Sequence, residues 1–156
     1  MGIQIIYIGR QNKNLYSESE KEFIKRIKRY SRLDIIEIKP LKKASSLPKE
    51  ELLKSETKLI LDKVNQNTAL VLLDEAGKQF DSRGFAKELQ ILLNHHSSIS
   101  FVIGGAFGFS DELKSKSHKR VSLSSMTFPH HLARVIFLEQ LYRAYSILNN
   151  EPYHND

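Results

Sequence analysis

A turn of small residues that directly follows a mainly apolar run is the part of the chain best suited to binding a ligand. The run is Ile99–Ile103, which predicts a buried strand, and the turn is Gly104–Gly108, which holds three of the seven glycines. Glycine at the carboxyl end of a strand lets the backbone turn sharply and lets a ligand approach closely. In open α/β sheets this edge is where ligands bind. The stretch therefore predicts a binding pocket.

The spacing of these glycines excludes the two commonest nucleotide-binding patterns. They do not form G-x-G-x-x-G, and no Gly-Lys-Ser/Thr follows them as in a P-loop. Another apolar run, Ala69–Leu73, ends at Leu73 and is followed directly by Asp74. The end of this run should lie beside the turn because sequential strands are usually adjacent. The loop Leu123–Phe128 adds backbone polar groups, a methionine and apolar side chains. Together these features suit an adenine-bearing ligand, and the alternative is a tight connection without a ligand.

The titratable side chains give weaker signals. The six histidines form no H-x-x-x-H or H-x-x-E-H pattern, so no metal site is expected, and the absence of cysteine excludes thiolate catalysis. Tyr153-His154, in the polar tail, is either part of a disordered end or a group that folds over a substrate, and the residue pattern alone favours disorder. Arg143 either forms a surface ion pair with Glu139 or holds a phosphate.

The hydrophobic pattern predicts an α/β scaffold for these residues. Continuous apolar strands that alternate with helices are typical of a parallel sheet covered by helices on both faces. A length of 156 residues fits one domain, 1–156. The predicted strands are Ile3–Ile8, Leu33–Lys39, Ala69–Leu73 and Ile99–Ile103, with a short extended piece at Arg120–Ser122. The predicted helices are Tyr16–Ser31, Pro48–Val64, one capped by Asp81 or Ser82, a short polar one after Gly108, and Pro129–Asn149.

The predicted last helix, Pro129–Asn149, is apolar around most of its circumference. One packing surface needs only a stripe of about 100°. A second apolar face predicts a second partner, most simply another copy of the chain in a homodimer. The alternative is a helix that is fully buried within one domain.

The formal net charge of +6 suits a polyanionic partner. Basic residues crowd the predicted first helix, among them Lys25 and Arg29, although a solvated helix face is the simpler alternative. The apolar run Ile3–Ile8 is too short for a signal peptide, and no run approaches the roughly 18 apolar residues of a membrane span. We therefore expect a cytoplasmic protein with no membrane partner.

Four motifs together resemble one known family. They are I-G-G-x-x-G within Phe101–Gly108, L-S-x-M-T-F-P-H at Leu123–His130, R-x-x-x-x-E-Q-x-Y-R-A at Arg134–Ala144, and P-Y-H at Pro152–His154. The chain resembles the ribosomal RNA large subunit methyltransferase H family over essentially its whole length. Phe107 and Phe109 depart from the smaller or more polar residues common there, and so does the end Asn155-Asp156, where a basic residue is common.

The resemblance implies a fold, a cofactor and a substrate. The fold is that of the SPOUT class, an α/β domain with a C-terminal trefoil knot, and the family forms homodimers. The family binds S-adenosylmethionine in the knot and methylates N3 of a pseudouridine in 23S ribosomal RNA of the assembled ribosome. The cofactor residues carried over by position are Leu73, Gly104, Gly105, Leu123, Ser124, Ser125, Met126, Thr127 and Phe128.

Roles for the remaining polar residues follow as hypotheses. Tyr153 and His154 would close over the base, from the same or the other subunit, and His154 would relay a proton because an imidazole titrates near neutral pH. Arg143 would hold RNA or favour the N3 anion. The other residues expected to contact RNA are Arg134, Lys25 and Arg29. The alternatives are a non-catalytic ribosome or RNA-binding factor with the same fold, and a small doubly wound domain that binds a nucleotide or flavin.

Overall fold

The chain folds around a five-stranded parallel sheet. The computed structural model describes residues 2–9 and 13–156, and in that part of the chain the strands run in the order β2-β1-β4-β3-β5, each neighbouring pair parallel. Leu73 lies opposite Ile103 in the register of β3 and β4, which confirms the predicted adjacency. The strands are β1 (Gly2–Ile8), β2 (Arg32–Ile38), β3 (Thr68–Gln79), β4 (Ser98–Ile103) and β5 (Lys119–Ser122).

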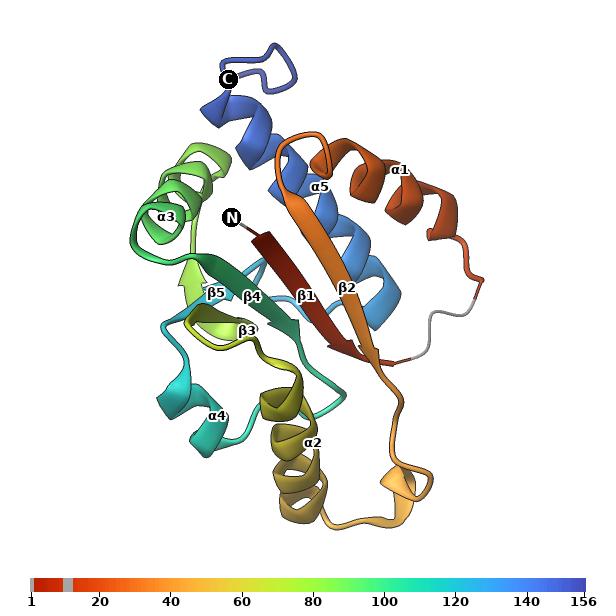
Figure 1. Cartoon of the computed structure of the whole chain (residues 1–156). Helices are drawn as coiled ribbons and strands as arrows, with labels where there is room; N and C mark the ends of the chain where they lie inside the picture. The colour runs from red at the N-terminus through yellow and green to blue at the C-terminus, as the bar shows by residue number, and fades with distance from the viewer. Residues whose placement is uncertain (1, 10–12) are drawn as a thin grey trace.

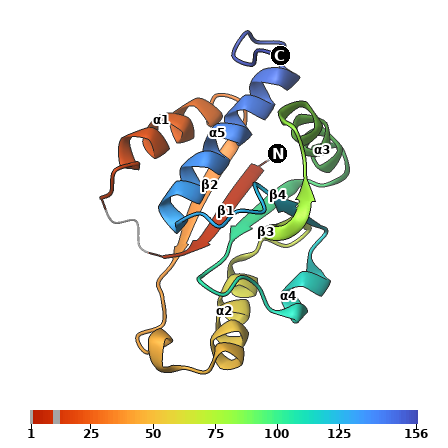
Figure 2. The same cartoon turned by 180° about the vertical axis from the view of Figure 1, so that it is seen from behind.

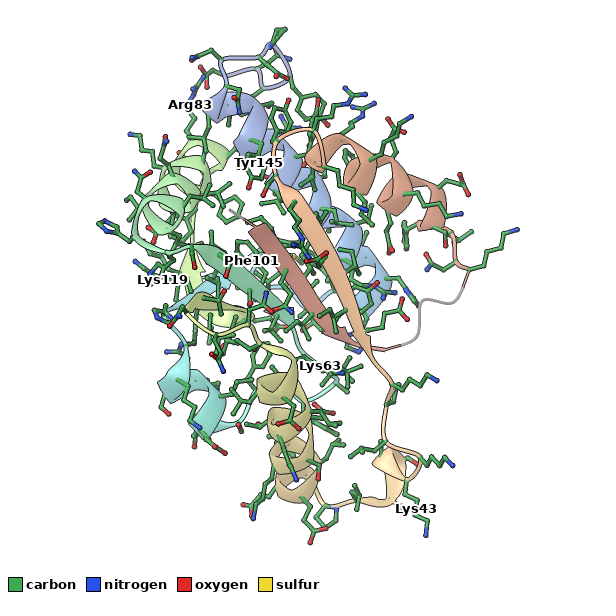
Figure 3. All side chains as sticks on the ribbon, in the orientation of Figure 1. Lys43, Lys63, Arg83, Phe101, Lys119 and Tyr145 are labelled. Atoms are coloured by element: carbon green, nitrogen blue, oxygen red, sulfur yellow. The ribbon has the colours of Figure 1, made fainter. Side chains whose placement is uncertain are left out.

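Helices cover both faces of this sheet, as the sequence predicted. Figure 1 shows α5 behind the strands, and Figure 2 shows the same helix in front of them. Side chains alternate between faces along a strand, so Ile5 joins the core beneath α1, α3 and α5, whereas Ile6 joins the core beneath α2 and α4. Phe101, labelled in Figure 3 at the middle of the sheet, packs its ring 4.9 Å from that of Phe137. The helices are α1 (Ser17–Ile27), α2 (Lys49–Lys63), α3 (Ser82–His95), α4 (Asp111–Lys116) and α5 (His130–Leu148).

Short polar side chains set where two of the helices, α3 and α4, begin. The Asp81 side chain accepts the Gly84 N–H at 2.6 Å, so Asp81, and not Ser82, caps α3. Ser110 caps α4 by accepting the Leu113 N–H at 3.1 Å. Helix α1 ends at Ile27, four residues earlier than the sequence pattern predicted, and a turn then leads into β2.

Strand β3 is longer than predicted and carries a bulge. We expected the strand to end at Leu73, but β3 continues to Gln79. Leu73 and Lys78 both pair with Val121, so residues 74–77 are looped out of the β3–β5 ladder. Gly77 permits the close approach of β5, because a Cβ there would lie 2.7 Å from the Arg120 backbone. The bulge turns this part of β3 toward the carboxyl end of β4.

A buried set of polar side chains links three strands near the amino end of the sheet. The Gln4 side-chain amide donates to the Lys63 carbonyl at 2.8 Å, and Ser100 Oγ donates to Gln4 Oε1 at 2.7 Å. The Thr68 and Ser100 hydroxyls lie 3.1 Å apart and share a hydrogen bond. Because each of these groups has a partner, their burial avoids the cost of an unpaired polar atom.

The described helices give no sign of a membrane-spanning segment. None of them, within residues 2–9 and 13–156, is both long enough and apolar enough to cross a bilayer.

Candidate active site

A cleft of about 720 Å³ opens where β3 and β4 end. Its walls are the turn Gly104–Gly108, the bulge of β3, the loop 123–128 and the first turn of α5. Of the nine predicted cofactor residues, all of which lie in the described part of the chain, eight line this cleft and Ser125 does not. Its volume is within the range of typical small-molecule sites. The eight that line it are Leu73, Gly104, Gly105, Leu123, Ser124, Met126, Thr127 and Phe128.

The glycine turn needs its glycines for both shape and packing. The Gly108 N–H donates to the Gly105 carbonyl at 3.2 Å, and Gly108 has a φ of 72°, a conformation that side chains disfavour. A Cβ on Gly104 would lie 3.0 Å from the Phe109 ring. A Cβ on Gly105 would lie 3.0 Å from the carboxylate of Glu56, on α2. The turn is therefore pressed against the body of the protein and gives the cleft a firm wall.

The loop opposite the turn is held by its own side chains. Ser122 Oγ donates to the Ser124 carbonyl at 2.9 Å, and the Met126 N–H donates to Ser124 Oγ at 3.0 Å. Such hydroxyl–backbone bonds order a segment without a helix or strand. Leu123 and Met126 then give this wall its apolar side chains.

Charged groups of opposite sign line different parts of the cleft. Asp74 and Glu75 come from the bulge of β3, whereas Lys49 comes from the start of α2 and Lys114 from α4. The Asp74 carboxylate accepts the Ala76 N–H at 3.0 Å, which fixes its position at the edge of the sheet. The cleft can thus accept positive charge on one wall and negative charge on the other.

Arg134 belongs to α5, and its side chain is buried against α1 and not in solvent. Only 3% of its surface is exposed, its Nε lies 3.7 Å from Glu20 Oε1 on α1, and its guanidinium lies 4.2 Å from the centre of the Tyr7 ring. Burial raises the pKa of Glu20 above its ordinary value, and the Arg134 charge opposes that rise. The buried guanidinium offers an RNA phosphate no exposed surface in this chain, and contact of Arg134 with RNA stays a prediction.

The C-terminal tail is packed, which corrects the disorder that the residue pattern alone favoured. The Tyr153 hydroxyl donates to Glu139 Oε1 at 3.1 Å, and its ring lies 4.6 Å from that of Tyr142. Burial, with the Glu139 carboxylate next, raises the pKa of Tyr153. Arg143 Nη1 lies 3.2 Å from His154 Nδ1. The three predicted catalytic residues, Tyr153, His154 and Arg143, therefore form one cluster.

Two hydrogen bonds fasten the very end of the tail to α3. Arg83 Nε donates to Asp156 Oδ1 at 2.6 Å, and Arg83 Nη2 donates to Asp156 Oδ2 at 2.7 Å. Figure 3 shows Arg83 beside the tail. Asp156 is one of the residues at which the sequence departs from the family pattern. In this fold its carboxylate forms an ion pair with Arg83.

The C-terminal tail follows the end of α5 (Figure 1), whereas the cleft lies at the start of that helix. His130, at the start of the helix, lines the cleft, and Arg143 follows it by 13 residues. At about 1.5 Å per residue they are about 20 Å apart along the helix axis. Within one chain, Tyr153 and His154 therefore cannot touch a ligand in the cleft.

The basic face of α1 is open to solvent. Lys25, on this helix, and Arg29, in the turn that follows it, are both exposed. Their exposure leaves them free to meet an anionic surface, although it equally fits a solvated helix face.

Comparisons with known proteins place this architecture in a family. A family model described as "Predicted SPOUT methyltransferase" matches residues 1–154. The chain belongs to the SPOUT methyltransferase family. Proteins named "Ribosomal RNA large subunit methyltransferase H" from Flavobacterium johnsoniae and Bacillus cytotoxicus are 40% and 39% identical to it, each over 99% of both chains.

A solved structure gives independent support for the fold. It is described as that of "a probable methylase family protein from Haemophilus influenzae Rd KW20", and it superposes with a TM-score of 0.53. The match covers 99% of this chain and 70% of that one at 14% identity, so it concerns the fold alone. The trefoil knot that the SPOUT class implies stays a prediction for this chain.

The cleft of this SPOUT methyltransferase fits the methyl donor that the family implies. Leu73, Leu123 and Met126 provide apolar surface for an adenine ring, and the backbone of the loop lies within reach of its edge. Glu75 suits the positive charge of a sulfonium or an ammonium, whereas the Asp74 carboxylate already lies 3.5 Å from the Arg120 guanidinium. Among the described residues, no group of three or more His, Asp and Glu side chains is placed to hold a metal ion.

Sequence reasoning missed several residues of the SPOUT cleft. Lys49 and Lys114 reach it from helices distant in the chain, and no local pattern marks them. Ala133 lies one helical turn after Pro129. The predicted start of the helix was therefore the sequence feature that could have indicated it. Other lining residues to which sequence reasoning assigned no role include Glu75, Ala76, Phe109 and His130.

Proposed function

We propose that this SPOUT protein uses S-adenosylmethionine to methylate N3 of a pseudouridine in 23S ribosomal RNA of the assembled ribosome, as a cytoplasmic homodimer. The observation that carries the proposal is the cleft: eight residues assigned to the cofactor by family position, from three separate segments, line it together. Relatives about 40% identical over the full length are named as ribosomal RNA large subunit methyltransferases.

The bound cofactor would supply an electrophilic methyl group on a sulfonium. The cleft walls contribute proximity and alignment, because they hold the donor in one orientation at the edge of the sheet. The target base must leave its stack to reach a donor in a cleft. Its N3 proton must leave during transfer, and His154, held by Arg143, is our candidate to accept or relay that proton.

The separation within one chain argues that two copies form each active site. His154 is at the far end of α5 from the cleft, so the His154 that serves one cleft would come from the other subunit. Helix α5 has apolar side chains that the rest of the chain only half buries, among them Leu132, Val135 and Ile136. A second copy of α5 packed on this face would bury them, which supports a homodimer.

Subunit complementation tests this arrangement. Chains with His154→Ala should be inactive, and so should chains with Gly105→Leu, whose side chain would press on Glu56 and displace the turn that forms one wall of the cleft. Mixed dimers of the two should recover activity, because one of their two sites combines an intact cleft with an intact tail. If mixtures stay inactive while both variants still form dimers, each chain completes its own site and the arrangement proposed here is wrong.

The substrate is tested by reverse transcription of ribosomal RNA. N3 methylation blocks the pairing edge of the base, so wild-type RNA should give a strong stop in the 23S transcript. Deleting the gene should remove that stop, and restoring the gene should return it. A stop that persists in the deletion strain contradicts the proposed substrate. Binding to ribosomes without any methylation would favour the non-catalytic RNA-binding factor.

A further inference from the structure

Two large apolar side chains remain in solvent at the mouth of the cleft. Among the described residues, four large apolar side chains are mainly exposed, and Phe107 and Met126 are the two that line the cleft. Phe107 is 53% exposed, and Met126 is 73% exposed. Met126 belongs to the loop assigned above to the cofactor. Phe107 has no role yet, and exposing an aromatic ring to water is unfavourable unless something covers it.

The fold presents Phe107 in a defined place. It is the third residue of the turn closed by the hydrogen bond from Gly108 to Gly105, and that turn is packed on Glu56. The ring is therefore carried by a tight turn and not by a long loop. Because the turn is already ordered, binding there loses less conformational entropy than binding to a flexible loop would.

A lysine lies beside the Phe107 ring, and a second lysine lines the same cleft, whose carboxylates Asp74 and Glu75 come from the bulge of β3. Lys49 Nζ lies 5.8 Å from the centre of the ring, and Lys114 lines the same cleft. Lysine is depleted in the cores of protein–protein interfaces, whereas a ring flanked by lysines is the usual composition of a nucleic-acid surface. Lys49 faces one side of the ring, so the exposed remainder is open to a flat partner.

We propose that Phe107 stacks on a nucleobase of the ribosomal RNA next to the methylated one. This inference rests on the proposed function and identifies how that site holds its RNA. When the target base turns out of the stack into the cleft, its neighbour loses a stacking partner. Phe107, at the mouth of the cleft, replaces that partner, and Lys49 and Lys114 lie close to the adjoining phosphates. The residue then positions the RNA without touching the reacting atoms.

Three variants of the full-length protein separate stacking from other roles. Phe107→Leu keeps an apolar side chain but removes the aromatic face, Phe107→Tyr keeps that face, and Ile91→Ala removes an exposed apolar side chain from α3 as a control. The substrate is ribosomes from the deletion strain. Ribosome affinity is measured by co-sedimentation, ribosome KM by methyl incorporation, S-adenosylmethionine affinity by calorimetry, and subunit state by analytical ultracentrifugation.

Stacking predicts a specific pattern among these measurements. Phe107→Leu should raise the ribosome Kd and KM about 5- to 100-fold, because base–aromatic stacking is of that size. Phe107→Tyr and Ile91→Ala should stay within about twofold of wild type. The cofactor affinity and subunit state should be unchanged in all three.

Other results would overturn the inference. Equal ribosome affinity for Phe107→Leu and Phe107→Tyr would exclude stacking. A matching loss of cofactor affinity in Phe107→Leu would assign the ring to the cofactor, and dissociation into monomers would assign it to the subunit interface. If wild-type protein binds ribosomes without methylating them, the proposed function fails while the affinity ratio still decides the role of Phe107. If wild-type protein does not bind ribosomes, both proposals are wrong.

Discussion

Replacing Arg134 by methionine should destabilise the protein far more than removing a surface charge. The guanidinium and the Glu20 carboxylate are both almost fully buried, 3.7 Å apart, between α1 and α5. Methionine fills a similar volume but leaves the carboxylate without its cation. The variant therefore isolates the electrostatic part of the contact between these two helices.

The structure sets the size of the effect. At 3.7 Å two unit charges attract by about 4 kcal/mol at an effective dielectric constant of about 20. Breaking one partner of a buried pair costs about 3–5 kcal/mol, because the remaining charge is left desolvated. We expect Arg134→Met to lower the free energy of unfolding by about 3–5 kcal/mol. Replacing Glu20 by leucine as well should recover most of that loss.

Urea unfolding at a fixed protein concentration measures this difference, since a dimer's stability depends on concentration. The matched control is Lys116→Met, which removes an exposed ion pair with Glu112 at 3.2 Å and should cost at most about 0.5 kcal/mol. If Arg134→Met costs no more than the control, the pair is not desolvated and the reasoning is wrong. The same conclusion follows if the double variant is as unstable as the single one.

The pH dependence gives a second check on this pair. Burial raises the pKa of Glu20, and removing the Arg134 charge should raise it further. From the ordinary carboxyl pKa up to this raised value, the folded variant binds more protons than the unfolded chain, so its stability falls as pH rises. The deficit of Arg134→Met should therefore be smaller in acid than at neutral pH. A deficit that does not change with pH would contradict a charged, buried Glu20.

Three further predictions concern the cleft, the tail and α1. Gly105→Ala should weaken S-adenosylmethionine binding, because its Cβ would lie 3.0 Å from the Glu56 carboxylate and displace the turn. Calorimetry measures this affinity, and a wild-type value would mean that the turn accommodates the methyl group without moving the cleft wall. His154→Ala should reduce the methylation rate of ribosomes about 10²- to 10⁴-fold at unchanged cofactor affinity, and an unchanged rate would exclude the proton relay. Reversing the charges of Lys25 and Arg29 should weaken ribosome binding and flatten its salt dependence by a slope of about one to two, whereas an equal loss of cofactor affinity would indicate misfolding.

Three of the strands, β1, β2 and β4, could be read from the sequence because each is rich in apolar residues. Predicted and observed limits of β1, β2 and β4 agree within a residue or so. The far half of β3 was missed because Asp74 and Glu75 are polar, and a bulge that turns toward a cleft has no hydrophobic pattern. The place of β1 between β2 and β4 was missed as well, because strand order depends on contacts between distant segments.

The candidate site was predictable where neighbouring residues form it, and not where distant ones meet. The turn Gly104–Gly108 and the loop 123–128 carry local motifs, and both line the cleft. Arg134 carries a family motif too, yet its charge faces Glu20 from another helix, and only the fold shows that contact. The placement of the tail far from the cleft of its own chain also required the three-dimensional structure.

The hydrogen-bonded set Gln4, Ser100 and Thr68 has a consequence for how the sheet assembles. A slip of β4 by one residue against β1 would send Ser100 to the opposite face and leave the Gln4 side-chain carbonyl oxygen without its donor. Apolar contacts alone tolerate such slips better, since isoleucine packs against many neighbours. The three side chains thus select one alignment during folding. In protein engineering they form a single unit: exchanging one of them for an apolar residue should cost stability, and only a joint exchange could preserve it.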